Sequence, residues 1–325
     1  MAKRKQQQPP TTKPRSQFGG NAPGLLELDR FSTVSLERWR RLSADLDEIN
    51  DLLYFGIEPQ RQRHRDEMLA ALQSVPPLSI QFSRWSRLVS YQYSLTPLSA
   101  AGSLTNYGGR FNIGTDVDKA MRSPWPALYL AENLETAFRE KFQIERGELV
   151  DGLTPEELAL ESTVSFSAVF VDGQMERVFD VGDPKSLEAL CKVLRKITLP
   201  AEVRTILRRL QLTPQHVYML RSPRQLQDEI LTKNWRGAPV QFGVPAPSQI
   251  LAGLIYDAGY EGIRYPSTKN GTSCLAVFPS NIASAHSYVE LSDSPPEGVS
   301  FPRLDIDSAE LLCGWELLRA RDRPR

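Results

Sequence analysis

The chain has 325 residues, 41% of them hydrophobic and 24% charged, values typical of a globular protein that buries a sizeable core. Its 39 Lys and Arg residues balance 39 Asp and Glu residues, so the formal net charge of +0 gives no global field that would attract nucleic acid. Direct nucleic-acid binding is therefore not expected. No apolar run approaches the roughly 20 residues that span a bilayer, so we expect no membrane association. Three widely spaced cysteines without a CxxC pair argue against a disulfide framework or a zinc site and favour a reducing compartment. A cytoplasmic protein is the expectation.

The N-terminal quarter predicts a tail followed by helices. Residues 1–23 are basic and rich in Gln and Pro, a composition typical of a disordered tail, and they lack the apolar segment of a secretion signal. From Ser35 onward, apolar residues recur at steps of three and four, which predicts a helix. Pro59 is expected to end that helix, and residues 60–73 are expected to form a second one. Residues 24–77 are thus predicted to be an α-hairpin extension.

The remaining chain mixes strands and helices. Near-alternating apolar and aromatic residues predict a strand at 78–93. Short apolar runs predict strands at 127–131 and 274–278, and a further strand is expected at 165–171. A helix is expected after Asn133, which is a suitable N-cap, and further helices at 184–210 and 248–260. The elements follow no regular βαβ order, which favours the α+β class. We therefore expect a main domain at 78–292 with a helical insertion at about 145–245. A C-terminal tail at 293–325 is expected to contain one short helix, 308–319.

The sequence lacks several familiar catalytic motifs. Its histidines, His64, His216 and His286, are far apart, and it contains no HExxH, Gly-x-Ser-x-Gly or GxxxxGK[ST] motif. These absences disfavour a metalloprotease, an α/β-hydrolase and a P-loop enzyme.

A dispersed set of polar residues remains as candidates for chemistry. Arg110 lies in the glycine-rich run "NYGGRFNIG" (106–114), and Tyr129 interrupts an apolar strand. Glu140 lies on the next predicted helix, and Ser267 lies in a second glycine-bounded loop. Each has an ordinary structural alternative: a surface ion pair, a core tyrosine, a solvated glutamate or a turn serine. Helical periodicity does not choose between Glu140 and Glu135.

Three segments in order, "SAAGSLTNYGGRFNIG", "PALYLAENLETAFREKF" and "GYEGIRYPSTKNGTSCLAVF", resemble the RES-domain family. This family is the toxin component of certain bacterial toxin–antitoxin pairs. The resemblance implies a mixed β core surrounded by helices, similar to the fold of ADP-ribosyltransferases. Carried over by motif, the resemblance assigns catalytic positions to Arg110, Tyr129, Glu140 and Ser267. It implies substrate-binding roles for Arg87 (with Arg84 as a competitor), Gly108, Gly109 and Asn112.

The resemblance also implies an activity. RES proteins destroy NAD at the nicotinamide–ribose bond, with phosphate or water as acceptor, so NAD is the expected substrate and no metal or other cofactor is expected. The expected partner is a helix-turn-helix antitoxin of the Xre type. Within the nucleotide pocket, Glu140 would stabilise the ribosyl cation, while Arg110 and the backbone N–H groups of Gly108 and Gly109 would bind the pyrophosphate.

Two other functions stay open from the sequence. One is an ADP-ribosyltransferase that modifies a macromolecule. The other is a non-enzymatic interaction protein on a degenerate RES scaffold.

Overall fold

A computed structural model describes residues 33–117, 122–144, 166–210 and 219–314. The expected tail 1–23 lies outside the described residues, as does the end of the expected helix 308–319. The chain divides into two compact units, Met1–Gly56 with Leu199–Val217 and Ile57–Thr198 with Tyr218–Arg325. No described helix is both long enough and apolar enough to cross a membrane.

The smaller unit consists of two helices that pack through a small apolar contact. Most of helix α1 (Thr33–Arg63) belongs to it, together with α6 (Ala201–Arg209). Ile49 of α1 is buried against three apolar residues of α6, Val203, Ile206 and Leu207. The helix partner of this part of α1 is therefore remote in sequence.

The expected helix break at Pro59 is wrong. Helix α1 continues through Pro59 to Arg63, and a single residue, His64, separates it from α2 (Arg65–Gln73). Antiparallel helix pairs need a loop of about 2–5 residues, so the described part of 24–77 forms no α-hairpin. The exposed position of Pro59 lets the helix tolerate the loss of one backbone hydrogen bond.

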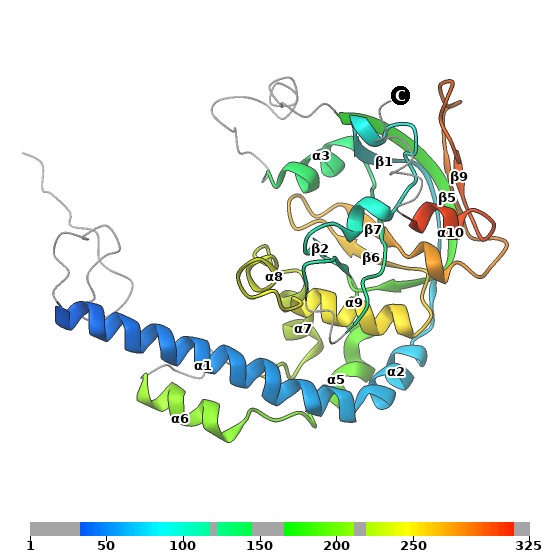
Figure 1. The fold of residues 1–325 in the computed structure, drawn as a ribbon. Coiled ribbons are helices and arrows are strands. Elements are labelled where there is room, and N and C mark those ends of the chain that lie inside the picture. The colour runs from blue at the N-terminus through cyan, green and yellow to red at the C-terminus, as the bar shows by residue number, and fades with distance from the viewer. Residues whose placement is uncertain (1–32, 118–121, 145–165, 211–218, 315–325) are drawn as a thin grey trace, which may run out of the picture. The chain divides into compact units, whose positions relative to one another are not determined.

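The larger unit is built on one mixed sheet of seven strands (Figure 1). In spatial order they are β1 (Leu78–Ser90), β4 (Leu128–Ala131), β7 (Ser273–Val277), β6 (Gly262–Pro266), β5 (Phe166–Asp180), β8 (Tyr288–Leu291) and β9 (Arg303–Leu304). β1 pairs with both β4 and β5, so β1, β4, β7, β6 and β5 form a closed hydrogen-bonded ring. Only the β5–β6 pairing is parallel among the pairings described. The α+β class with a mixed β core is confirmed.

Strand β5 corrects the expected insertion at 145–245. It begins at Phe166 and runs for 15 residues, pairing with β1 along nearly its whole length. It also pairs with β6 and β8, so part of the presumed insertion is central to the sheet. The residues that follow supply η4 (Pro184–Leu187), α5 (Glu188–Leu194), α7 (Pro223–Ile230) and α8 (Gly237–Phe242). The expected continuous helix at 184–210 is broken around Pro200, with α6 beyond it.

The C-terminal stretch is more than a tail. Strand β9 extends the sheet by pairing with β8, and Leu312 of α10 (Ala309–Cys313) is fully buried. A 3-10 turn, η5 (Pro279–Asn281), lies in contact with α10.

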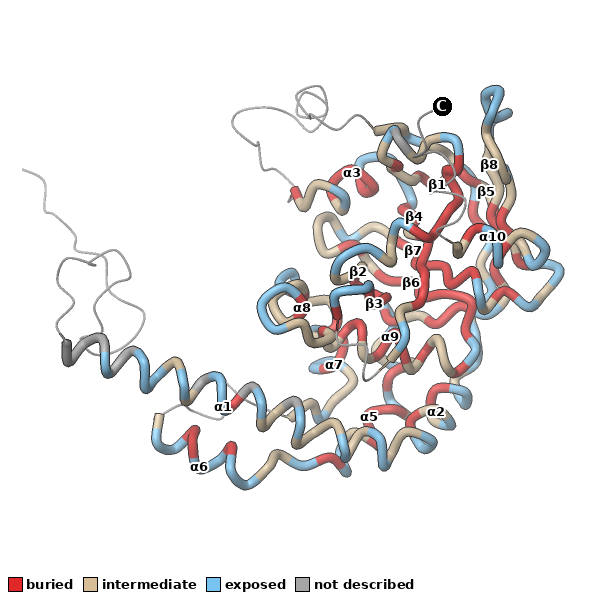
Figure 2. Tube along the Cα trace, in the orientation of Figure 1, coloured by how far each residue is buried: buried red, intermediate tan, exposed pale blue. Residues whose placement is uncertain are grey.

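Apolar side chains form two clusters in the larger unit. Figure 2 marks the buried residues along the strands of the sheet and along its helices. One cluster joins the sheet to α2, α5, α7 and α9 (Pro247–Asp257). The other contains Phe82, Val171, Met175 and Leu312. Within it α10 packs on residues of the sheet. Apolar packing in both clusters thus fixes the strands of the sheet relative to one another.

Helix α3 (Leu134–Phe142) follows β4 immediately and matches its prediction. The Asn133 side chain accepts a hydrogen bond from the Thr136 N–H at 2.9 Å, which confirms the expected N-cap. The helix ends at Gln143, whose backbone adopts the left-handed conformation at φ 61°. These two caps fix both ends of α3 and thereby the position of Glu140, which lies near its C-terminal end.

Candidate active site

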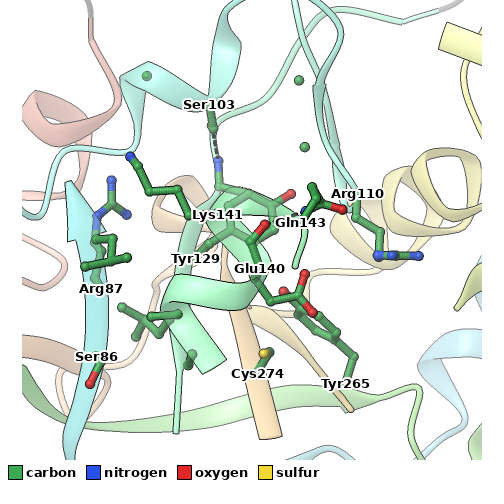
Figure 3. A pocket seen from close by; sticks show the side chains of 18 of the residues that line it. Ser86, Arg87, Ser103, Arg110, Tyr129, Glu140, Lys141, Gln143, Tyr265 and Cys274 are labelled. Atoms are coloured by element: carbon green, nitrogen blue, oxygen red, sulfur yellow. Dashed lines mark hydrogen bonds between the residues drawn. The ribbon is translucent and has the colours of Figure 1, made fainter. Parts of the chain in front are cut away.

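A pocket of about 330 Å³ opens between the glycine-rich run, α3 and the central strands (Figure 3). Six of the eight site residues expected from the sequence line it: Arg87, Gly108, Gly109, Arg110, Tyr129 and Glu140. The other two contact this set, since Ser267 bonds to Glu140 and Asn112 bonds to Tyr129. Residues from five separate parts of the sequence therefore meet at one cavity.

The glycine-rich run folds as a very small hairpin. Strand β2 (Gly108–Gly109) pairs with β3 (Asn112–Ile113), and Arg110 and Phe111 form the loop between them. Gly108 has φ +81°, a conformation that side chains rarely adopt. A Cβ on Gly109 would lie 2.6 Å from the ring carbon Cζ of Tyr129 and would overlap its hydroxyl. Both glycines are therefore required by the protein's own packing.

Tyr129 supports this hairpin from beneath. Its hydroxyl donates to Asn112 Oδ1 at 2.8 Å and accepts from the Phe111 N–H at 2.9 Å. Burial raises the pKa of the phenol, so the hydroxyl stays protonated and able to donate. The hydroxyl is committed to the hairpin, while the ring lines the pocket.

Arg110 is buried at 6% exposure, and much of its guanidinium is bonded to the protein. Nη1 donates to the carbonyls of Ile230 and Thr232, at 3.0 and 2.7 Å, where α7 ends. Nη2 lies 3.3 Å from the Thr268 hydroxyl. Burial lowers the pKa of Arg110. Arg110 thus ties the hairpin to the loop after α7, in addition to lining the pocket.

Glu140 projects from α3 into the centre of the pocket, as Figure 3 shows. Its Oε1 accepts a hydrogen bond of 2.6 Å from Ser267 Oγ. Ser267 is 4% exposed and is itself held by the Lys269 N–H at 3.1 Å. The alternative glutamate, Glu135, instead pairs with Arg139 one turn earlier on the helix. The geometry therefore selects Glu140 over Glu135 as the pocket carboxylate.

Two cations, Arg87 and Lys141, lie on one side of Glu140, and Arg110 lies on the other (Figure 3). Arg87 of β1 donates to the Ser99 carbonyl at 2.8 Å, and burial lowers its pKa to about 10. Lys141 is exposed, yet partial burial of its ammonium, together with the nearby charge of Arg87, lowers its pKa. Arg84, the competitor of Arg87, bonds to Asp293 at the surface.

Several pocket residues were not predicted from the sequence. Lys141, Trp235, Arg236, Tyr265 and Cys274 all line the cavity. Burial raises the pKa of the Cys274 thiol, so it stays protonated. Of these five residues, only Lys141 could have been expected from the sequence, because it adjoins Glu140. Trp235 and Arg236 lie in a segment with no recognisable motif, and Tyr265 reads as an ordinary strand residue.

Among the residues that the structure describes, no group of three or more His, Cys, Asp or Glu side chains could hold a metal ion. The groups that the described part of the pocket offers to a ligand are cations, one carboxylate, hydroxyls and aromatic rings. Such a set suits an anionic ligand with an aromatic part.

Comparison with known proteins gives a family match. A search of curated proteins finds none that matches. Among solved structures, a chain of "the M.tuberculosis MbcT-MbcA toxin-antitoxin complex" is 15% identical with a TM-score of 0.43, covering 76% of this chain and 96% of that one. The family model of the RES domain matches residues 186–300, a range that contains Ser267, Trp235, Arg236, Tyr265 and Cys274. The resemblance to the RES-domain family is thereby confirmed, and residues 186–300 carry the RES match.

Proposed function

We propose that this protein is an NAD-degrading toxin enzyme that cleaves the bond between nicotinamide and ribose. One observation carries the proposal: Glu140 is the only acid among the described residues that line the pocket. Four cationic side chains line the same cavity, Arg87, Arg110, Lys141 and Arg236. NAD has the complementary pattern, since its pyrophosphate is anionic and its reacting ribose becomes cationic.

The reaction breaks the C–N bond between ribose and the pyridinium ring. The bonding electron pair moves to the ring nitrogen, so nicotinamide leaves as a neutral molecule and the ribosyl carbon gains positive charge. A carboxylate beside that carbon lowers the barrier by electrostatic stabilisation. Glu140 takes this role, and the hydrogen bond from Ser267 fixes its orientation. Phosphate or water then adds to the ribosyl carbon.

The remaining groups of the pocket bind the substrate. The pyrophosphate lies against the arginine and lysine side chains, of which Arg87 and Lys141 are the pair beside Glu140. The rings of Tyr265 and Trp235 supply flat apolar surface for nicotinamide or adenine. Tyr129 acts through its ring and by holding the hairpin, since its hydroxyl already has two hydrogen bonds.

The activity of an enzyme that depletes NAD must be inhibited in the cell that makes it. We therefore propose an antitoxin partner of the helix-turn-helix, Xre type, which is the partner that the RES resemblance implies. This proposal is supported by the RES-domain match rather than by any contact in the structure.

The test is product analysis by mass spectrometry after incubation of the purified protein with NAD, in the presence and absence of phosphate. Free nicotinamide is the expected product whether phosphate or water is the acceptor. ADP-ribose 1″-phosphate formed only with phosphate identifies a phosphorylase, and ADP-ribose identifies a glycohydrolase. Label from NAD on a protein or nucleic acid would instead identify an ADP-ribosyltransferase. Intact NAD after prolonged incubation would contradict an enzymatic function.

A further inference from the structure

Gln249, the third residue of helix α9, lies outside the pocket yet contacts the hairpin that carries Arg110. Its side-chain nitrogen Nε2 lies 2.8 Å from the Tyr107 carbonyl and 3.0 Å from the carbonyls of Gly109 and Asn112. One amide group therefore bonds to the backbone on both strands of the hairpin. Gln249 is 1% exposed, so water does not supply an alternative donor.

The orientation of the Gln249 amide is fixed by its other atom. Oε1 accepts a hydrogen bond of 3.0 Å from the Ala246 N–H, at the start of α9. A flipped amide would place its oxygen against three carbonyl oxygens and its NH₂ group against an N–H. Only one orientation satisfies the site, so the NH₂ group faces the hairpin.

The hairpin needs such support. Two-residue hairpin loops favour turn types with positive φ, because the other types splay the strands. Neither Arg110 nor Phe111 has positive φ. Moreover, β2 and β3 form a separate two-stranded sheet with only two residues in each strand, and an isolated pair of strands is marginal in water.

External side chains hold the hairpin at two places. Tyr129 bonds to the Phe111 N–H at the loop, and Gln249 bonds to the carbonyls at its base. Asn112 links the two, since its Oδ1 accepts from both the Gly109 N–H and the Tyr129 hydroxyl. Gln249 and Tyr129 thus bond to adjacent residues of the hairpin and share Asn112 as a partner.

We propose that Gln249 is a positioning residue for Arg110: its amide holds the hairpin in the geometry that presents the Arg110 guanidinium and the Tyr129 ring to the pocket. The inference rests on the proposed function for its kinetic consequence, but the hairpin geometry itself is independent of any activity.

The first measurement follows hydrogen exchange of the peptide that covers residues 106–114. Gln249→Met keeps the size of the side chain and removes the amide, so amide protection of this peptide should fall while protection of the sheet strands is retained. The control is Ser248→Ala. Ser248 is the adjacent, fully buried residue of α9, and its hydroxyl has no hydrogen-bond partner among the residues that the structure describes. Unchanged protection of 106–114 in Gln249→Met would overturn the proposal, whether or not the protein degrades NAD.

The second measurement is a double-mutant cycle on nicotinamide release. A displacement of about 1 Å at a catalytic site can cost about 10²-fold in rate, and we expect a loss of roughly 10- to 100-fold for Gln249→Met. If Gln249 acts through Arg110, the double variant with Arg110→Lys should lose little more than Arg110→Lys alone. Additive losses would contradict a positioning role. If Gln249→Met does not fold, Gln249→Asn keeps an uncharged amide but shortens its reach to the hairpin carbonyls, and protection of 106–114 should still fall.

Discussion

Ser267 Oγ lies 2.6 Å from Glu140 Oε1, although the two residues are 127 positions apart in the chain. Ser267 follows the end of β6, and Glu140 lies on α3 after β4. Strand β7 pairs with both β6 and β4, so it brings their ends to the same part of the sheet. The buried hydroxyl donates to the carboxylate and leaves the other carboxylate oxygen for a ligand.

Replacement of Glu140 by Gln should reduce nicotinamide release by about 10²- to 10³-fold, the loss expected when one electrostatic contributor to a transition state is removed. The amide keeps the shape and can still accept from Ser267, so the fold should be retained. Rates by chromatography and the melting temperature check both points. The matched control is Glu135→Gln on the same helix, whose ion pair with Arg139 lies away from the pocket lining. Equal losses in the two variants would contradict the assignment.

Replacement of Ser267 by Ala should lower the rate by roughly 10-fold or more with little change in KM. A hydrogen bond to a charged group contributes about 1.5–3 kcal/mol, and its loss frees the carboxylate of Glu140 to rotate. Steady-state kinetics separate kcat from KM. A rise in KM at constant kcat would instead assign Ser267 to substrate binding.

Gly109→Ala should destabilise the fold by about 1–3 kcal/mol, the usual cost of an overpacked site, because the new methyl group overlaps the Tyr129 ring. Chemical denaturation measures this change. The control is Gly102→Ala, which also adds a methyl group at the pocket lining but meets nothing within 4 Å. Its stability should change by less than about 0.5 kcal/mol. Equal stability of the two variants would show that Tyr129 can move aside.

Anion binding beside Glu140 should weaken as the pH rises toward 10. Binding requires protonated Lys141 and Arg87, whose pKa values are lowered, that of Arg87 to about 10. The anion-dependent stabilisation is therefore complete well below these pKa values and lost as the pH passes through them, sooner than for an ordinary lysine.

The probe for this prediction is the rise in melting temperature caused by sulfate at pH 7 and at pH 10. Because sulfate also stabilises proteins without binding, Lys141→Met at the same ionic strength is the reference. The wild type should exceed this variant at pH 7, and the difference should shrink at pH 10. An equal sulfate response in both proteins at pH 7 would exclude Lys141 from the anion site.

Local sequence signals predicted much of this protein. Alternation of apolar residues identified β1, and short runs of mainly apolar residues identified β4, β7 and the start of β5. The cap at Asn133 located the start of α3, because an N-cap depends on residues within one turn of the helix. The motifs also named six of the residues that line the pocket, together with the buried Asn112 beside it.

Long-range contacts decided the rest. Helical periodicity could not distinguish Glu140 from Glu135, whereas the structure places Glu140 in the pocket lining, bonded to Ser267. Pro59 predicted the end of a helix, but helix α1 continues past this residue. The sequence also could not reveal that Gly109 leaves space for the Tyr129 ring, or that Gln249 bonds to the hairpin from 140 residues away. Periodicity and capping are local, whereas hydrogen bonds and steric contacts between distant segments exist only once the chain has folded.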